Sequence, residues 1–358
     1  MRSKKRLFIL GVLLIITVLI HWFCSNKTVV ELHYSSTLYP YISFALTSAF
    51  GWLSFSIGDI LYGFLVAWLL FNGCRFISQV FQKKISRQQV LGLFIKILSN
   101  ALLIYILFNV LWGINYNREG IASNLGLKVE KYSTTELLLV DSLLLQKVNN
   151  RKAVLLHQSN AFDKKNLFNE AAAAYAVLGK QYPFLAYYPE SIKPSMWGWL
   201  GNYVGFLGYY NPFTGEAQVN TTVPEFLLPF TSCHEIAHQL GYAKENEANF
   251  VGYLAAAASA DTFFHYSVYL DLFLYTNRNL YGRDSGSAKH FASQLLPAVK
   301  ADLMAWKEFD RQHQNPLEPL VRWAYGKYLQ GNQQPSGMKS YDEVTGLLIA
   351  YYKKMGVL

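Results

Sequence analysis

Long apolar runs dominate the first third of the chain, and they predict membrane-spanning helices. Three stretches are almost free of charged residues, and we place spans at about residues 7–23, 58–74 and 97–114. A helix of roughly 20 apolar residues crosses a hydrocarbon core of about 30 Å, so each stretch is long enough once flanking residues are included. A fourth stretch, Tyr41 to Ser56, is shorter and contains Ser and Thr. We expect it to lie at the interface or to pack against the bundle.

Beyond residue 113 the pattern becomes that of a globular, mainly helical domain. One segment differs: Tyr203 to Asn220 is rich in Gly, aromatic and β-branched residues around the turn sequence NPFTG, which predicts a β-hairpin. The fold class is therefore a membrane anchor, residues 1–113, followed by a mainly α domain with a small β-hairpin or sheet, residues 114–358. Helical spacing of apolar residues predicts helices at 133–148, 164–181, 245–274, 289–311 and 340–354.

Charge follows the same division and orients the chain. The net charge is +9, yet ten of the 32 basic residues and only two of the 23 acidic ones lie in residues 1–113. Because these positive charges stand beside the apolar runs, they indicate membrane topology and not nucleic-acid binding. The basic N-terminus and the basic loop expected at 75–96 are predicted to be cytoplasmic. The domain after about residue 115 then lies outside the cytoplasm, anchored in the inner membrane. If Tyr41 to Ser56 also spanned, the orientation would reverse.

The sequence argues against two other interpretations, a cleaved signal peptide and a role for the cysteines in disulfides or zinc binding. The first apolar run could be a signal peptide, but no A-x-A-like cleavage site follows it, so we favour an uncleaved anchor. The three cysteines are Cys24, Cys74 and Cys233. The first two lie at opposite ends of membrane segments, which argues against a disulfide scaffold or a cysteine-based zinc site. We expect Cys233 to be a small buried residue.

The segment HEIAH, from His234 to His238, carries the candidate chemistry. On a helix, residues four apart lie on one face, so both imidazoles point the same way with Glu235 beside them. Two neutral imidazoles at that spacing suit Zn²⁺, and the pattern H-E-x-x-H is typical of zinc hydrolases. We therefore predict that His234 and His238 bind zinc and that Glu235 is the catalytic base.

A third protein ligand is expected from the next element. Gly241 should end the helix, and Lys244 stands where a third histidine would fall, which leaves Glu245 and Glu247. We choose Glu245 because Asn249 lies one turn later on the same face, where its amide could support a ligand, whereas Glu247 points about 200° away around the helix.

Two resemblances bear on this site. The segments HEIAH and ENEAN resemble the gluzincin metallopeptidases, although Asn249 stands where many members have Asp and the gap between His238 and Glu245 is short. Three apolar runs together with GYYNPFTGEAQVN, PFTSCHEIAHQLGYAKENEANF and SYDEVTGLLIAYYKK are also similar to an uncharacterised family of bacterial membrane proteins, a domain of unknown function with a metallopeptidase-like motif. Together they imply a zincin-like α+β domain that uses Zn²⁺, and they name no substrate.

The expected activity is hydrolysis of peptides or proteins outside the cytoplasm. Zinc would polarise the carbonyl and lower the pKa of a water molecule, and Glu235 would pass the water's proton to the leaving amine. Tyr275 and Arg278 are candidates for stabilising the oxyanion, and the hairpin could pair with an extended substrate. The alternatives are a catalytically inactive metal-binding interaction protein, an intramembrane protease, and hydrolysis of a non-peptide amide.

Overall fold

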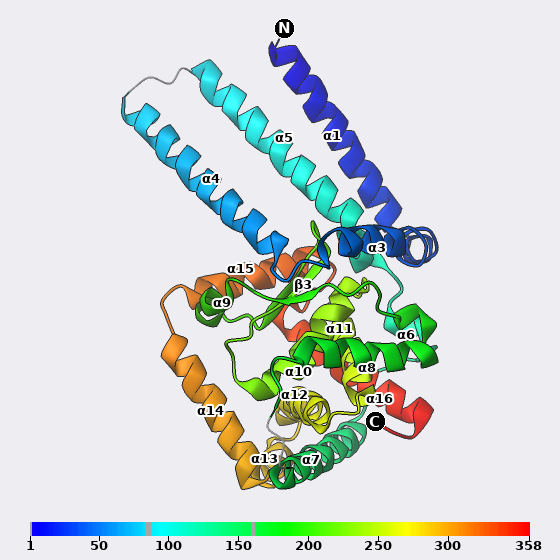
Figure 1. The fold of residues 1–358 in the computed structure, drawn as a ribbon. Helices are drawn as coiled ribbons and strands as arrows, with labels where there is room; N and C mark the ends of the chain where they lie inside the picture. Colours follow the sequence, from blue (N-terminus) through cyan, green and yellow to red (C-terminus); the bar gives the residue numbers. More distant parts are fainter. Residues whose placement is uncertain (1, 83–86, 159–161) are drawn as a thin grey trace.

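Three long helices stand on one side of the globular part of the chain (Figure 1). A computed structural model describes residues 2–82, 87–158 and 162–358. The helices are α1 (Arg2–Cys24), α4 (Ile57–Phe81) and α5 (Arg87–Leu111), and each is long and apolar enough to cross a membrane. The three predicted apolar helices are thereby confirmed, with the third ending at Leu111 and not at residue 114.

The basic loop predicted at 75–96 is wrong in its extent. Arg75 lies inside α4 and Lys96 lies inside α5, so most of this segment is helical. Long basic side chains can extend from a helix end toward water, so charges flanking a span need not end the helix. Lys83 and Lys84, which also carry the charge of this segment, lie outside the described residues.

The chain between α1 and α4 packs against the globular part and adds no span. Most of the stretch from Tyr41 to Ser56 lies in α3 (Leu38–Phe50), a helix of 13 residues. Figure 1 shows α3 crossing the ends of α1 and α5. Tyr34 and Tyr39 from this region join a buried cluster with Trp112, after α5, and with Tyr210 of the sheet. The short elements here are α2 (Lys27–Val30), a π-helical turn η1 (Glu31–Ser35) and α3 (Leu38–Phe50).

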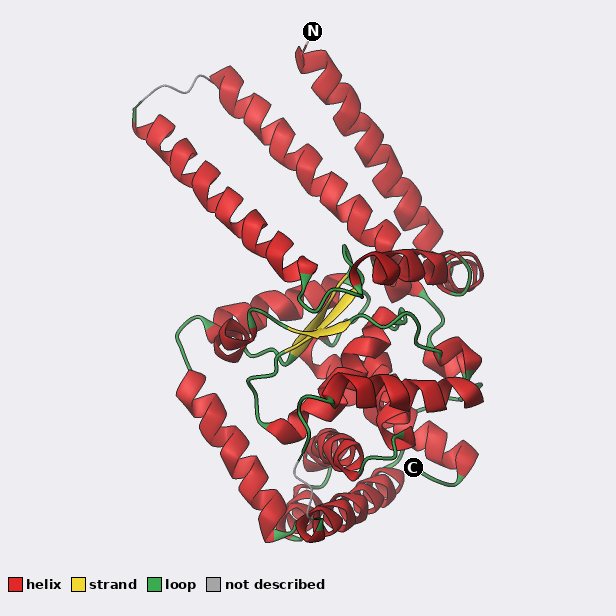
Figure 2. Ribbon diagram, in the orientation of Figure 1, coloured by secondary structure: helices red, strands yellow, loops and turns green. Residues whose placement is uncertain are grey.

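The remaining chain is mainly helical around one small sheet (Figure 2). The predicted helix at 133–148 begins with a capping box between Ser133 and Glu136 and continues to His157. The elements are η2 (Gly113–Asn117), α6 (Ile121–Asn124), α7 (Thr134–His157), α8 (Leu167–Gln181), η3 (Pro183–Leu185), β1 (Ile192–Pro194), α9 (Gly198–Val204), β2 (Gly208–Asn211), β3 (Glu216–Val219), η4 (Glu225–Leu227), α10 (Leu228–Gln239), α11 (Glu245–Ala258), α12 (Thr262–Tyr281), α13 (Ser285–Ser293), α14 (Pro297–His313), α15 (Glu318–Gly331), η5 (Gly337–Glu343) and α16 (Val344–Met355).

The predicted hairpin is present, although it is shorter than the segment from Tyr203 to Asn220. Strands β2 and β3 pair antiparallel, with Asn211 opposite Glu216 at the turn. Gly215 has a φ of 67°, which glycine adopts without strain, so the NPFTG turn closes as predicted. β1 pairs parallel with β3, which gives the order β1-β3-β2 and leaves β2 at an edge. The residues before β2 form α9 and not a strand.

Two predicted helices are each split in two. The helix predicted at 245–274 ends at Ala258, and α12 begins at Thr262 after Asp261 caps it by accepting a bond from the Phe263 amide. The helix predicted at 289–311 is interrupted before Pro297, which starts α14. Apolar periodicity continues across both breaks because α12 and α14, which follow the breaks, bury an apolar face in the same core as the helices before them. The pattern alone therefore misses the turns.

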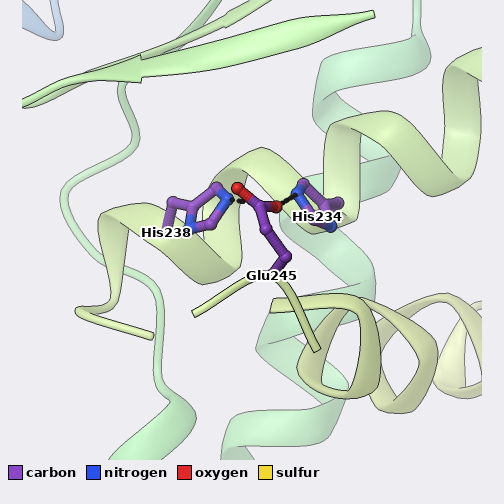
Figure 3. A group of neighbouring side chains, drawn as sticks. All are labelled: His234, His238 and Glu245. Carbon is purple, nitrogen blue, oxygen red and sulfur yellow. Dashed lines mark ion pairs between the residues drawn. The ribbon is translucent and has the colours of Figure 1, made fainter. Parts of the chain in front are cut away.

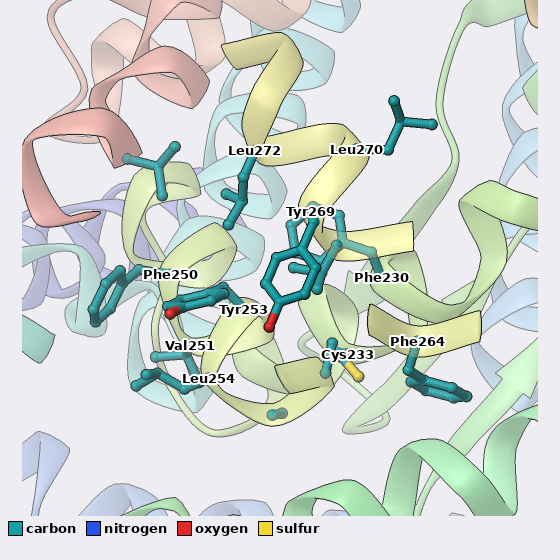
Figure 4. Close-up of a cluster of buried hydrophobic side chains, with 14 of the residues drawn as sticks. Phe230, Cys233, Phe250, Val251, Tyr253, Leu254, Phe264, Tyr269, Leu270 and Leu272 are labelled. Carbon is teal, nitrogen blue, oxygen red and sulfur yellow. The ribbon is translucent and has the colours of Figure 1, made fainter. Parts of the chain in front are cut away.

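The core lies between α10, α11 and α12 (Figure 4). Cys233 is fully buried among these helices, as predicted. Gly252 of α11 faces the backbone of α10, where an added Cβ would stand 3.0 Å from the amide nitrogen of His234. That is closer than a side chain normally allows, so glycine lets α11 approach the helix that carries the two histidines.

Candidate metal centre

Helix α10 places two imidazoles on one face, as the spacing of four residues requires. The ring centroids of His234 and His238 lie 4.7 Å apart, and Figure 3 shows both side chains directed to the same point. Both are nearly buried. The C-terminal turn of α10 therefore offers two neutral nitrogen donors side by side whenever neither ring is protonated.

The chain leaves α10 through a glycine turn that also orients His238. Gly241 has a φ of 85°, its amide donates to the His238 carbonyl, and the Tyr242 amide donates to the Ala237 carbonyl. These two bonds are the Schellman arrangement at a helix end. The turn brings the Tyr242 carbonyl oxygen to 2.8 Å from Nδ1 of His238. When the proton lies on Nδ1 and is held by that carbonyl, the lone pair of Nε2 faces Glu245 and is free to bind a metal ion.

Glu245, the first residue of α11, completes the group. Its Oε2 lies 3.3 Å from Nε2 of His234 and 3.4 Å from Nε2 of His238 (Figure 3). The possible ligand atoms of all three residues lie within 4.8 Å of one another. Glu247 lies elsewhere: its carboxylate is 3.4 Å from the ammonium of Lys244. The structure thus brings Glu245, and not Glu247, to the histidines.

The donor set fits a divalent transition-metal ion. Oε2 of Glu245 is buried and receives no hydrogen bond from the described residues. A buried carboxylate oxygen without a donor is costly unless a cation or proton faces it. Two imidazoles and one carboxylate are the protein ligands of many catalytic zinc sites, which keep a further position for water or substrate. His234, His238 and Glu245 are therefore the residues that could hold such an ion.

The electrostatic interactions within the group also favour a positive charge between the three side chains. Burial would lower the pKa of His238, but Glu245 outweighs it and raises the pKa to about 9. Burial would raise the pKa of Glu245, but the two histidines hold it well below the usual range. Burial lowers the pKa of His234. The carboxylate of Glu245 therefore attracts one positive charge to this point, either a proton on His238 or a cation.

Glu235 lies beside the group and is buried with it. It is 4% exposed, and its Oε2 has no hydrogen-bond partner among the described residues. Burial raises its pKa to about 8; His238 opposes this shift and the charge of Glu245 adds to it. Gly208 of β2 packs directly on its carboxylate, since a Cβ there would be 2.6 Å from Oε1. A carboxylate with a near-neutral pKa suits a group that accepts and then releases a proton.

Two tyrosines that sequence reasoning did not select lie against the same group. The hydroxyl of Tyr325, on α15, donates to Oε1 of Glu245 at 2.8 Å. The hydroxyl of Tyr341, in η5, lies 3.3 Å from that of Tyr325, and its ring stacks at 6.4 Å on His234. The chain contains 25 tyrosines, so composition gives no means of choosing these two. Only the folding of the last segments onto α11 identifies them.

Asn249, Tyr275 and Arg278 were the residues predicted to lie around the metal ligands, and each has a different environment in the structure. Asn249 is buried, and its amide donates to the Tyr341 carbonyl at 3.4 Å, so it supports the segment that covers His234. Arg278 has an exposed side chain that pairs with Asp342 at 3.1 Å. Tyr275 is partly buried, and burial, with the charge of Asp271, raises its pKa.

Residues that precede α7 support the C-terminal end of α10, and the sequence alone did not indicate them. The indole of Trp112 donates to the His238 carbonyl at 2.9 Å, and the hydroxyl of Tyr39 donates to the Gln239 carbonyl at 2.7 Å. Arg118 contacts the Gly241 carbonyl and forms a buried ion pair of 2.7 Å with Glu31. These bonds satisfy carbonyls that a helix end leaves open.

The structure is that of a mainly helical protein with three candidate membrane-spanning helices. Its globular domain contains a buried group of two histidines and one glutamate. The chain belongs to the family described as a protein of unknown function, DUF3810, whose model matches residues 34–349. The expected relationship to an uncharacterised family is thereby confirmed. The match includes α3, two of the apolar helices and the whole candidate centre. No curated protein and no solved structure matches the chain.

Proposed function

We propose that this protein is a membrane-anchored, zinc-dependent metallopeptidase that hydrolyses peptide bonds outside the cytoplasm. The observation that carries the proposal is the convergence of His234, His238 and Glu245 on one point, with Glu235 next to the first ligand in sequence. This is the constellation that zinc hydrolases need: three protein ligands and a separate carboxylate base.

Each residue has a distinct role in this mechanism. His234, His238 and Glu245 hold the ion, which would supply Lewis-acid polarisation of the scissile carbonyl. Glu235 accepts the proton of the attacking water and delivers it to the leaving amine. Tyr325 positions Glu245 through its hydrogen bond. The hydroxyl of Tyr341 is the group we assign to stabilise the oxyanion, because it is not bonded to Glu245 itself.

The location follows from the number of spans and the distribution of charge. If all three candidate helices cross the membrane, the N-terminus and the candidate centre lie on opposite sides of it. Arg2, Lys4, Lys5 and Arg6 precede the first span and favour a cytoplasmic N-terminus. The substrate class is then a peptide or protein on the extracytoplasmic side of the inner membrane. Nucleic acid is not an expected partner.

The test uses the full chain purified in detergent and measures bound zinc together with hydrolysis of a peptide library. We expect about one zinc ion per wild-type chain, and its loss in His238→Ala and in Glu245→Ala. Glu235→Gln should keep the metal and lose hydrolysis. Glu247→Gln, a neighbouring buried carboxylate outside the group, is the control and should keep both. Zinc-free wild-type protein that is well folded would remove the enzyme proposal.

One observation favours the alternative, a catalytically inactive metal-binding interaction protein. Each of the four residues His234, Glu235, His238 and Glu245 is less than 10% exposed, so the group is buried. A peptidase must open this buried group to admit a substrate, whereas a purely structural metal site is normally closed. Zinc bound by wild-type protein, with no hydrolysis and an unchanged phenotype in Glu235→Gln cells, would establish this alternative.

A further inference from the structure

Helix α15 has an apolar face that no part of the described chain covers. Leu317, just before the helix, is 64% exposed, Leu320 is 59% exposed and Trp323 is 62% exposed. Residues 320, 323, 324 and 327 share one side of a helix by their spacing of three and four. Lys327 is the one charged residue among these four. A helix that faces water normally has the opposite pattern, with polar residues outward.

The opposite face of α15 is committed to the candidate centre. Leu329 is fully buried, and the hydroxyl of Tyr325 donates to Glu245. The helix is therefore held in a fixed orientation by its inner face. The outer apolar face is exposed because the helix is fixed in this orientation, and not because the end of the helix unfolds.

Helix α9 extends this apolar surface. Trp199 is 55% exposed, and Leu200 and Tyr203 are also exposed. The two helices lie next to each other, and Figure 1 shows both on the side of the globular part from which the long helices project. The amide of Asn315, before α15, donates to the Tyr203 carbonyl and ties the segments together. We call these exposed residues of α9 and α15 the apolar shelf.

The apolar shelf is continuous with the ends of the long helices. Tyr328 of α15 lies 6.5 Å from the ring of Phe108 in α5, and its hydroxyl is 3.3 Å from that of Tyr116. On the other side, the indole of Trp197, next to α9, donates to the carbonyl of Asp59 in the first turn of α4. The shelf is thus fixed beside the point where α4 and α5 meet the globular part.

We propose that the apolar shelf lies in the lipid–water interface of the leaflet next to the globular domain. Helices with one apolar face lie in the plane of that interface, and Trp and Tyr concentrate there. A bilayer explains the shelf better than a protein partner does, because the long helices already fix the membrane beside it. The shelf therefore adds an in-plane contact to the three spans. Through Tyr325, the same helix that rests on lipid also contacts Glu245. This inference depends on the spans and not on the metal.

The test measures how deep the shelf lies in a membrane. The full chain, with Cys24→Ala and Cys74→Ala, receives a nitroxide label through Leu320→Cys or Trp323→Cys and is placed in phospholipid nanodiscs. Cys233 stays because it is fully buried. Collisions of the label with apolar oxygen and with a water-soluble nickel chelate report its surroundings. Phe64→Cys, on the outside of α4, is the lipid control, and Met304→Cys, 64% exposed on α14, is the water control.

Labels at 320 and 323 should both have an oxygen-to-nickel collision ratio several-fold above that at 304 and approaching that at 64. A ratio equal to that at 304 would show that the shelf faces water and would overturn the proposal. Labels protected from both reagents would also overturn it, because a protein partner or a second copy would then cover the face. Both labelled positions are exposed, so the substitutions leave the packed core unchanged.

Discussion

The hydroxyl of Tyr325 donates a 2.8 Å hydrogen bond to Oε1 of Glu245, across 80 residues of sequence. This bond leaves Oε2 of the same carboxylate facing the two histidines. One oxygen is thus fixed by α15 while the other remains available to a metal ion. Groups that orient a metal ligand in this way strongly affect metal affinity.

Replacing Tyr325 by Phe should weaken zinc binding while leaving the fold intact. The variant loses only the hydroxyl, so Glu245 keeps its place but not its orientation, and we expect zinc affinity to fall about 10-fold or more. Competition with a fluorescent zinc chelator measures this. Tyr328→Phe is the matched control on the same helix, since its hydroxyl contacts Tyr116 and not Glu245. Equal affinities in the two variants would contradict the orienting role.

Gly208 should tolerate no side chain, because β2 packs on the carboxylate of Glu235. A Cβ at this position would be 2.6 Å from Oε1 of Glu235 and 2.8 Å from the carbonyl oxygen of Gln218. Gly208→Ala must displace either the carboxylate or the strand, and we expect hydrolysis to fall at least about 10-fold, since misplaced catalytic groups cost such factors. Zinc content should not change. Gly331→Ala, where no atom lies within 4 Å, should be neutral in the same two assays.

The buried pair of Glu31 and Arg118 should be important for stability. Glu31→Gln leaves the Arg118 guanidinium, 4% exposed, without its negative partner. An uncompensated buried charge costs roughly 3–5 kcal/mol, so the melting temperature in detergent should fall by several degrees. Glu119→Gln changes an exposed carboxylate nearby and should have little effect. A melting temperature unchanged in Glu31→Gln would show that water or another group replaces the pair.

A chain that begins at residue 115 should fail to reach the native state. It would lack Trp112 and Tyr39, which bond to the carbonyls of His238 and Gln239, and it would lack Glu31. Two carbonyls at the end of α10, those of His238 and Gln239, would then each lose a donor, and a buried group left unsatisfied costs roughly 1–3 kcal/mol. Thermal unfolding followed by circular dichroism measures the outcome. A soluble fragment with a cooperative unfolding transition and bound zinc would disprove this dependence of the globular domain on residues 1–114.

Asp271 should make stability decrease as the pH rises. It is buried on α12 with no hydrogen bond or ion pair in the described part of the chain, and burial raises its pKa to about 7. The unfolded carboxyl has a pKa of about 3.9, so the folded state binds the proton more tightly. Stability from this group is complete below about pH 4 and is lost as the pH rises through about 7, by up to roughly 4 kcal/mol.

The variant Asp271→Asn removes this ionisation with little change of shape. It should melt higher than the wild type at about pH 8 and at the same temperature at about pH 4. Glu130→Gln, an exposed carboxylate, should show no such pH-dependent difference. A constant difference at both pH values would mean that the amide changes packing and not ionisation.

The sequence by itself determined the features that depend on short spacings. The apolar runs are long enough to form α1, α4 and α5 wherever they lie, and a spacing of four puts His234 and His238 on one face. The φ of Gly241 ends α10 locally, and the short connection then limits where Glu245 can go. The NPFTG turn likewise fixes the hairpin from its own residues.

Only the tertiary structure decided which distant groups meet. Tyr325 and Tyr341 reach Glu245 and His234 because α15 and η5 fold back onto α11, and nothing in their local sequence separates them from the other tyrosines. The breaks before α12 and α14 escaped prediction because both halves of each pair bury an apolar face. Contacts between distant segments depend on the packing of the whole core, whereas a periodic pattern reports only which face of an element is buried.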